Sequence, residues 1–179
     1  GPVALGIDLR SSARYPTGLA VLDTGRRLHD LRVIRHDKEI KEVATLLQPA
    51  IVAIDAPLTL PEGRCCVSKS CVCASAGIMR VVDRACAAAG YRPFPALLPS
   101  MVNLTLRGIA LAGYFYERGT DVIEVYPGMA QDILGIPRKG RGAAARIKLQ
   151  RGLKRAGIKA SHGLIKLLMM SSTLLRLLW

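Results

Sequence analysis

Residues 3–9 read VALGIDL, a short apolar run with a single acidic residue, Asp8, near its end. Residues 51–56 read IVAIDA and repeat this design, with Asp55 in the corresponding place. Apolar runs of this length, bounded by turn residues, are typical of strands that are buried on both faces. We therefore expect two central strands of one sheet, each with an acid near its carboxyl end.

The elements around these two runs predict a specific fold class. The expected strands are residues 3–9, 17–23, 28–35, 51–56 and 121–126. The expected helices are residues 37–47, capped by Asp37, about 100–118, 128–134 and 143–156, with a short helical piece near 80–89. The first three strands form an antiparallel meander, and a helical crossover then brings the fourth strand back parallel to the first. This order predicts an α/β, RNase H-like fold: a mixed five-stranded sheet, made of the meander plus two parallel strands and flanked by helices.

The length and composition suit one domain. The chain has 179 residues, and half of them are hydrophobic, which is enough to bury a sizeable core. We expect a single domain over residues 1–179, with an irregular cysteine-containing insertion at about 60–97. The segment at about 159–179 is atypical because it is both basic and apolar.

The composition also excludes several classes of protein. Aromatic residues make up 4% of the chain, which argues against a platform of stacked aromatics for single strands. The most apolar run, residues 164–178, contains Lys166 and Arg176 and is too short to span a bilayer. No signal peptide opens the sequence, so we expect a cytoplasmic protein. A single Asn and three Gln fit a thermophilic source.

Positive charge is concentrated at the carboxyl-terminal end of the chain. The protein carries 26 Lys+Arg against 13 Asp+Glu, a formal net charge of +13. Residues 1–132 hold 15 basic and all 13 acidic residues, whereas residues 133–179 hold 11 basic residues and no acidic one. A one-signed basic segment on a balanced body indicates a partner that carries phosphates. We expect this partner to be a nucleic acid, DNA or RNA.

A candidate phosphate-contacting strip begins in the loop GIPRKGRG, residues 135–142. The loop resembles the start of a P-loop, but Arg141 and Gly142 replace the required Lys and Ser/Thr, so we expect no nucleotide site there. Charge runs are often only a solvated helix face, but the absence of compensating acids favours contact with nucleic acid. The strip comprises Arg138, Lys139, Arg141, Arg146 and Lys148, followed by Arg151, Lys154 and Arg155.

Four of the five cysteines fall within nine residues, in the pattern Cys-Cys-x4-Cys-x-Cys. Zinc sites usually combine two separated Cys-x2–4-Cys hooks or include His, and this pattern has neither. We favour disulfides or free thiols here, with a metal site as the third alternative. The cysteines are Cys65, Cys66, Cys71, Cys73 and Cys86.

The acids at the strand ends are the candidate catalytic residues. If the two central strands are parallel neighbours, Asp8 and Asp55 emerge together at one edge of the sheet. Carboxylates so placed repel each other unless a cation lies between them, and hard oxygen ligands suit Mg²⁺ or Mn²⁺. Glu124, near the end of the fifth strand, is a candidate third ligand, and its alternative is a structural pairing with an arginine such as Arg107. The chemistry that this set indicates is metal-assisted attack of water on a phosphodiester.

The same residues resemble an uncharacterised family. Its members are described as predicted nucleases with an RNase H-like fold, related to the Holliday-junction resolvase RuvC. The similarity covers about residues 3–158. The matching blocks are Gly6-Ile7-Asp8-Leu9, Thr17-Gly18-Leu19-Ala20, Ile54-Asp55-Ala56-Pro57-Leu58, Arg80-x2-Asp83, Pro99-Ser100-Met101, Arg107-Gly108 and Glu124-Val125-Tyr126-Pro127-Gly128.

The resemblance implies a role for each matched residue. It implies that Asp8 and Asp55 are metal ligands for Mg²⁺ or Mn²⁺. It also implies that a second group lines the cleft. That group comprises Arg80, Asp83, Arg107 and Glu124. The function implied is that of a divalent-metal-dependent nuclease acting on DNA or RNA.

The chain departs from the family at its closing helix. RuvC-like nucleases carry one or two further acids there, but here His162 is followed by an acid-free stretch that ends at Trp179. One interpretation is that the metal site has lost ligands and activity is impaired. Another is that residues 168–179 are encoded out of frame, which the nucleotide sequence tests. The substituted apolar helix would favour a homo-oligomer if it were exposed. The alternative function is a non-catalytic, basic nucleic-acid-binding protein on a nuclease-like scaffold.

Overall fold

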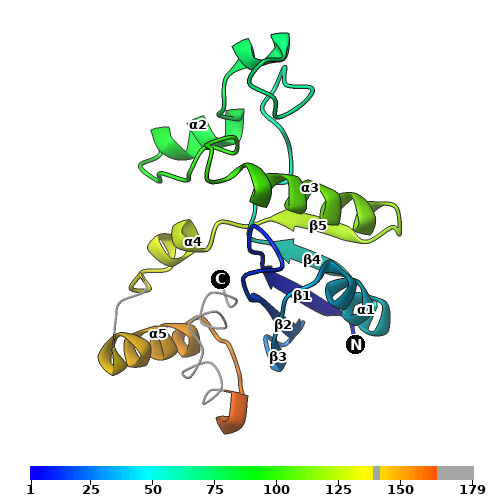
Figure 1. Ribbon diagram of the computed structural model, residues 1–179. Coiled ribbons are helices and arrows are strands. Elements are labelled where there is room, and N and C mark those ends of the chain that lie inside the picture. Colours follow the sequence, from blue (N-terminus) through cyan, green and yellow to red (C-terminus); the bar gives the residue numbers. More distant parts are fainter. Residues whose placement is uncertain (139–141, 165–179) are drawn as a thin grey trace.

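The computed structural model describes residues 1–138 and 142–164 (Figure 1). Their strands are β1 (Val3–Asp8), β2 (Thr17–Asp23), β3 (Leu28–Ile34), β4 (Ile51–Ile54) and β5 (Asp121–Glu124). Their helices are α1 (Asp37–Leu47), the 3-10 helix η1 (Val72–Ala76), α2 (Val81–Ala88), α3 (Val102–Tyr116), α4 (Pro127–Ile133) and α5 (Ala143–Arg155).

The five strands form one mixed sheet in the order β3-β2-β1-β4-β5. β1 pairs antiparallel with β2, and β2 with β3, while β4 pairs parallel with both β1 and β5. The expected fold class is therefore confirmed: three strands in an antiparallel meander continue into two parallel strands, in the arrangement of RNase H-like folds. The central position of β1 and β4 explains their continuous apolar sequences.

The main core lies between one face of the sheet and the helices α1 and α3. Alternate residues of β1, such as Leu5 and Ile7, are at most 2% exposed on this face, and Val52 and Ile54 of β4 are fully buried beside them. Phe115 of α3 packs against the same cluster. Because side chains alternate along a strand, Gly6 and Asp8 must point to the other face.

The other face is covered over β2 and β3 by α5. A second core cluster joins Ala20 and Leu31 of the sheet to Leu149 and Leu153 of the helix. After α5 the chain returns along β3, where the amide of Leu28 donates to the carbonyl of residue 159 at 2.7 Å. One apolar side of α5 is thus fixed to the sheet, which leaves its basic side facing outward.

The start of α1 differs from the expected cap. The helix is capped by His36, and the Glu39 carboxylate accepts a hydrogen bond from the His36 amide at 3.0 Å. Asp37 is the first helical residue instead, and its carboxylate accepts from the Arg107 guanidinium at 2.7 Å. The expectation that Asp37 caps this helix was therefore wrong, because an arginine distant in sequence takes its carboxylate.

Helix α3 approaches the end of β4 unusually closely. A Cβ at Gly108 would lie 2.7 Å from the Pro57 carbonyl oxygen and 3.0 Å from the Ala56 Cβ. Glycine at this position lets the helix backbone touch the segment that follows Asp55. The helix therefore positions the candidate site through backbone contact.

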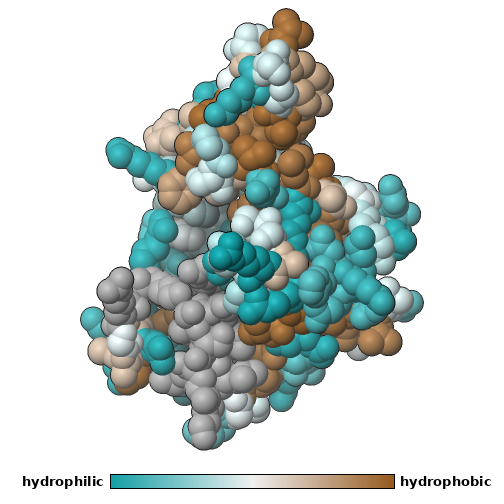
Figure 2. Space-filling model, in the orientation of Figure 1, coloured by the Kyte–Doolittle hydropathy of each residue, from teal (hydrophilic) through white to brown (hydrophobic). Residues whose placement is uncertain are grey.

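Residues 55–101 leave the sheet as a projecting insertion that holds η1 and α2 (Figure 1). Hydrophobic residues gather on the outer surface of this projection in Figure 2. Within residues 62–79 no side chain is buried, although Pro61 and Arg80 at its two ends are. The tip of the insertion therefore has no hydrophobic core of its own.

In the described part of the chain no helix is both long and apolar enough to cross a membrane. The atypical segment expected at about 159–179 lies outside the described residues beyond Leu164. The closing helix, the reading-frame hypothesis and the expected oligomer contact all concern that segment, and they stay predictions.

Candidate functional site

Asp8 and Asp55 lie side by side at the carboxyl ends of β1 and β4. Ile7 pairs with Ile54, and the Asp55 amide donates to the Ile7 carbonyl at 2.9 Å, so the parallel register continues to the two aspartates. Neighbouring strands lie about 4.8 Å apart, and residues in register point to the same face. Asp8 is 4% exposed and Asp55 is half-buried. The sequence-predicted pair is therefore adjacent.

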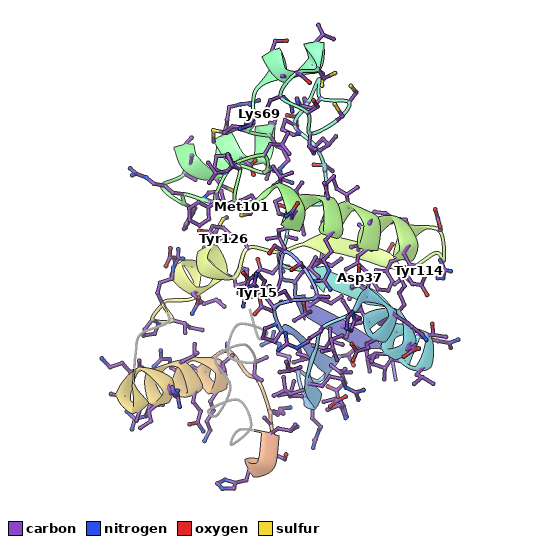
Figure 3. The ribbon with its side chains drawn as sticks, viewed as in Figure 1. Tyr15, Asp37, Lys69, Met101, Tyr114 and Tyr126 are labelled. Carbon is purple, nitrogen blue, oxygen red and sulfur yellow. The ribbon has the colours of Figure 1, made fainter. Side chains whose placement is uncertain are left out.

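The two aspartates line a cleft of about 710 Å³, which lies between the carboxyl ends of the strands, α2 and α4. Five of the six expected cleft or catalytic residues line it. These are Asp8, Asp55, Arg80, Asp83 and Glu124. The cleft also has apolar walls, which include Met101 and Tyr126, labelled in Figure 3 at the starts of α3 and α4.

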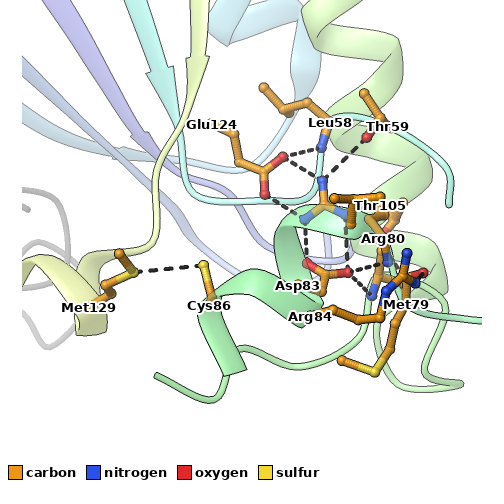
Figure 4. A network of polar contacts seen from close by, with 12 residues as sticks. Leu58, Thr59, Met79, Arg80, Asp83, Arg84, Cys86, Thr105, Glu124 and Met129 are labelled. Carbon is orange, nitrogen blue, oxygen red and sulfur yellow. Dashed lines mark hydrogen bonds and ion pairs between the residues drawn. The ribbon is translucent and has the colours of Figure 1, made fainter. Parts of the chain in front are cut away.

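An ion-pair network around the buried Arg80 and Asp83 stands at one wall of this cleft, and its third member, Glu124, is 33% exposed (Figure 4). Nη1 and Nη2 of Arg80 each lie 2.7 Å from an oxygen of Glu124. Nη2 also donates to Asp83 at 2.8 Å, and the amide of Arg80 donates to the same carboxylate at 3.0 Å. A second amide, that of Leu58, donates to Glu124 at 3.0 Å. The Arg80 guanidinium therefore links α2 to the end of β5, and Glu124 in turn binds the loop after β4.

Burial and charge act in opposite directions on this network. Burial by itself raises the pKa of Asp83, but hydrogen bonds from the Arg80 side chain and amide, together with its charge, hold that pKa below its ordinary value. Burial likewise disfavours the charged guanidinium, but Glu124 and Asp83 raise the pKa of Arg80 well above its ordinary value. The Arg80–Asp83 pair therefore favours the charged form of both partners.

In the strand register, Glu124 lies level with the residue before Asp55 and not with Asp55 itself. Its register partner on β4 is Ile54, which points into the main core, whereas Asp55 follows Ile54 and points to the other face. Its carboxylate is taken by a structural arginine, as one alternative for this residue predicted, but the arginine is Arg80 rather than Arg107. The family resemblance implies that Arg80 and Glu124 share the cleft, but no spacing pattern pairs them, because Arg80 comes from the irregular insertion.

Arg107 stands apart from the residues that line the cleft. Besides Asp37, its guanidinium donates to the carbonyls of Arg10 at 2.9 Å and Arg35 at 2.8 Å. These bonds join α3 to the loop after β1 and to the start of α1. Arg107 therefore supports the strand end that carries Asp8 and does not itself face the cleft.

The donor set of the cleft fits a hard divalent cation. Mg²⁺ is usually held by one or two carboxylates, keeps several waters and binds substrate phosphates. Asp8 and Asp55, adjacent and on one face of the sheet, are the residues that would hold it. Glu124 is engaged by Arg80, so the arrangement in the described residues offers two carboxylates.

The basic strip is divided between paired and exposed residues. Arg138 forms a two-pronged ion pair with Asp132, at 2.8 and 2.7 Å. Lys139 and Arg141 lie outside the described residues. Arg146 and Lys148 are exposed on α5, and within the described chain no ion pair involves them.

The cysteines divide into a cluster of four and a single one. Cys65, Cys66, Cys71 and Cys73 lie together in the insertion, and all five cysteines have free thiols. Cys86 lies on α2 instead, where its sulfur is 3.8 Å from that of Met129 at the cleft (Figure 4).

No protein-family model matches the chain, and no curated protein matches it. Among solved structures, that of RuvC from Thermus thermophilus is similar to it with a TM-score of 0.43 and 17% sequence identity. The match covers 97% of this chain and 92% of that one. This likeness is too distant to assign an activity.

Proposed function

We propose that the protein is a divalent-metal-dependent nuclease that hydrolyses phosphodiester bonds of DNA or RNA. The observation that carries this proposal is the pair Asp8 and Asp55, in register on adjacent parallel strands and facing one cleft. An acid at the end of each central strand has no role in the hydrophobic core, whereas together they suit Mg²⁺ or Mn²⁺. We infer that they bind the metal.

The remaining residues of the cleft have supporting roles in this proposal. A bound divalent cation supplies Lewis-acid activation of the phosphate and of water. Asp8 and Asp55 orient that ion against the sheet edge. Arg80 holds Glu124 and Asp83 in place and so fixes the cleft wall formed by α2 and the end of β5. The exposed Arg146 and Lys148 belong to α5, which covers the same face of the sheet from which Asp8 projects, and we assign them to phosphate contact.

The proposal is tested by assaying cleavage of labelled single- and double-stranded DNA and RNA with Mg²⁺ and Mn²⁺. We expect Asp8→Asn and Asp55→Asn each to lower the rate by about 100-fold or more, because a catalytic metal contributes several kcal/mol to the transition state. Calorimetry should show weakened metal binding in the same variants. Asp121→Asn is the matched control, since Asp121 is exposed at the amino end of β5, away from the cleft.

A second candidate function is supported by the pairing of Glu124. With that carboxylate bound to Arg80, the described residues offer two acids for a metal, and the basic segment after Asp132 adds none. The alternative is a non-catalytic nucleic-acid-binding protein on a nuclease-like scaffold. Tight nucleic-acid binding without cleavage at any concentration of either metal would establish this alternative and overturn the nuclease.

A further inference from the structure

The sulfur atoms of four cysteines converge at one point in the insertion. All four Sγ atoms lie within 4.8 Å of one another, and two of the separations are 3.7 Å. Four thiolates around a tetrahedral Zn²⁺, at a Zn–S distance of about 2.3 Å, are separated by about 3.8 Å. This four-cysteine cluster comprises Cys65, Cys66, Cys71 and Cys73.

The convergence of all four sulfurs is more than two disulfides require. A disulfide brings two sulfurs together, and nothing in its chemistry draws a second pair to the same point. The cluster is also too compact for a multi-iron centre, whose thiolates bind different iron atoms at the corners of the cluster. A tetrahedral set of four thiolates is the ligand set of a single soft or borderline ion, of which zinc is the most common.

The segment that carries the cluster has no hydrophobic core to stabilise it. No side chain is buried within residues 62–79, η1 has no buried residue, and Val72 is 90% exposed. Segments too small to bury apolar surface are commonly held by disulfides or by a metal, and metal binding then supplies their folding free energy. A bound metal ion would stabilise the conformation of this loop, which hydrophobic packing does not.

Backbone and basic groups surround the sulfurs of the cluster. The backbone of Ser68 hydrogen-bonds the Cys66 sulfur, and such outer contacts orient metal ligands. The Arg64 guanidinium donates to the carbonyls of Cys66 at 3.0 Å and Ser68 at 3.2 Å. Zn²⁺ with four thiolates carries a net charge of about −2, and Arg64 and Lys69 provide positive charge in the same loop.

We propose that the four-cysteine cluster is a structural zinc site. Its four protein ligands leave no open position for substrate, so it acts on the fold and not on the reaction. The site holds the segment that begins at Glu62, whose carboxylate accepts from the Val81 amide at 3.0 Å at the start of α2. Zinc therefore fixes the helix start next to Arg80 at the cleft wall.

The test measures metal content of the full chain, purified under reducing conditions from medium that contains zinc and iron. We expect one zinc ion per chain, lost in Cys66→Ser and Cys73→Ser. Cys86→Ser is the matched control, because this cysteine lies outside the cluster, and it should retain the zinc. Removal of zinc with a chelator should also expose Arg64 and Lys69 to trypsin, while the rest of the chain stays protected.

Any of four outcomes would overturn the zinc site. Iron bound in place of zinc is one, and unchanged zinc content in Cys73→Ser is another. The third is a metal-free native chain in which mass spectrometry finds the four cysteines joined as two disulfides. If the serine variants do not fold, titration of the metal-stripped native chain with Co²⁺ decides the matter. The absorption spectrum of tetrahedral cobalt thiolate should then appear at one equivalent and disappear on addition of Zn²⁺, and its absence would equally overturn the proposal.

Discussion

At the scale of single residues, Arg80 is the side chain on which the cleft wall depends. Its side chain is 4% exposed and forms ion pairs with both Asp83, which is 2% exposed, and Glu124. We expect Arg80→Met to destabilise the protein by about 3 to 5 kcal/mol, because it leaves a buried carboxylate without its counterion. Urea unfolding monitored by circular dichroism measures the change.

The neighbouring Arg84 gives the matched control. It is exposed on the same helix, and its guanidinium contacts only the Met79 carbonyl, at 2.9 Å, among the hydrogen bonds of the described residues. Arg84→Met should change the stability by less than about 0.5 kcal/mol. Equal effects of the two substitutions would contradict the role assigned to Arg80.

The lowered pKa of Asp83 predicts how this network depends on pH. A carboxyl whose pKa is lower in the folded than in the unfolded state stabilises the fold above its unfolded pKa, and this contribution is lost as the pH falls through the folded value. Asp83→Asn should therefore be most destabilising near neutral pH, and its deficit relative to the native chain should shrink as the pH falls below 3.8, the ordinary value for aspartate.

Denaturant unfolding of both proteins across the acid range measures this deficit. In an Arg80→Met background the stability deficit should shrink less in acid, because the side-chain hydrogen bond and the positive charge that lower the Asp83 pKa are gone, while the backbone amides of residue 80 and Ala96 remain. If Asp83→Asn lowers the free energy of unfolding by the same amount at every pH in the native background, the pairing with Arg80 does not lower the Asp83 pKa.

The residues of the site were predictable to different degrees. Asp8 and Asp55 could be placed from sequence because strand alternation and a parallel crossover are local rules that fix both face and register. The ion pair of Glu124 could not be predicted from residue spacing, since its partner Arg80 is 44 residues away in an insertion without a periodic hydrophobic pattern. Long-range ion pairs leave no spacing signal in a single sequence.

At the scale of elements, the contact between α3 and the end of β4 sets the position of Asp55. We expect Gly108→Ala to destabilise the protein by about 1 to 3 kcal/mol, because the new methyl group would overlap the Pro57 carbonyl oxygen. Gly113→Ala on the same helix meets nothing within 4 Å and should stabilise the protein by up to about 1 kcal/mol, the difference in helix propensity.

Thermal unfolding of the two variants side by side measures this contrast. Because Gly108 contacts the backbone two residues beyond Asp55, its substitution should also weaken binding of Mn²⁺, whereas Gly113→Ala should leave metal binding unchanged. If both variants are destabilised to the same extent, the helix tolerates no side chain at either glycine. The close approach of Gly108 to the Pro57 carbonyl oxygen would then not explain the effect.

The expected elements matched the structure where local pattern decides them. Strand 17–23 and helix 37–47 have the expected bounds, while the expected strands 51–56 and 121–126 each extend two residues beyond the observed strands. In both cases the extra residues lie where the chain leaves the sheet and enters the wall of the cleft. At such points, contacts with other elements replace the hydrogen bonds between strands, and hydrophobicity alone does not mark the end of the strand.

At the scale of the whole molecule, charge is distributed by face as well as along the chain. The sheet face from which Asp8 projects is covered in part by α5, with exposed Arg146 and Lys148, whereas α1 and α3 cover the other face. The sequence shows where the basic residues fall in the chain, but only the packing of α5 on β2 and β3 brings them to the face of the aspartates. In the nuclease proposed above, these basic groups would contact the same nucleic-acid backbone that the aspartate site cleaves.

This arrangement makes a quantitative prediction for nucleic-acid binding as salt is varied. Each phosphate contact contributes about 0.9 to the slope of log affinity against log salt for a duplex, and about 0.7 for a single strand. Lys148→Gln should therefore lower the magnitude of that slope by about 0.7 to 0.9, and adding Arg146→Gln should lower it by a similar amount again. Lys38→Gln makes the same chemical change on α1, whose helix covers the opposite face, and should leave the slope unchanged. Fluorescence anisotropy at several salt concentrations measures all three slopes. If the α1 and α5 substitutions lower the slope equally, binding follows net charge alone, and the face of α5 is not the phosphate-contacting surface.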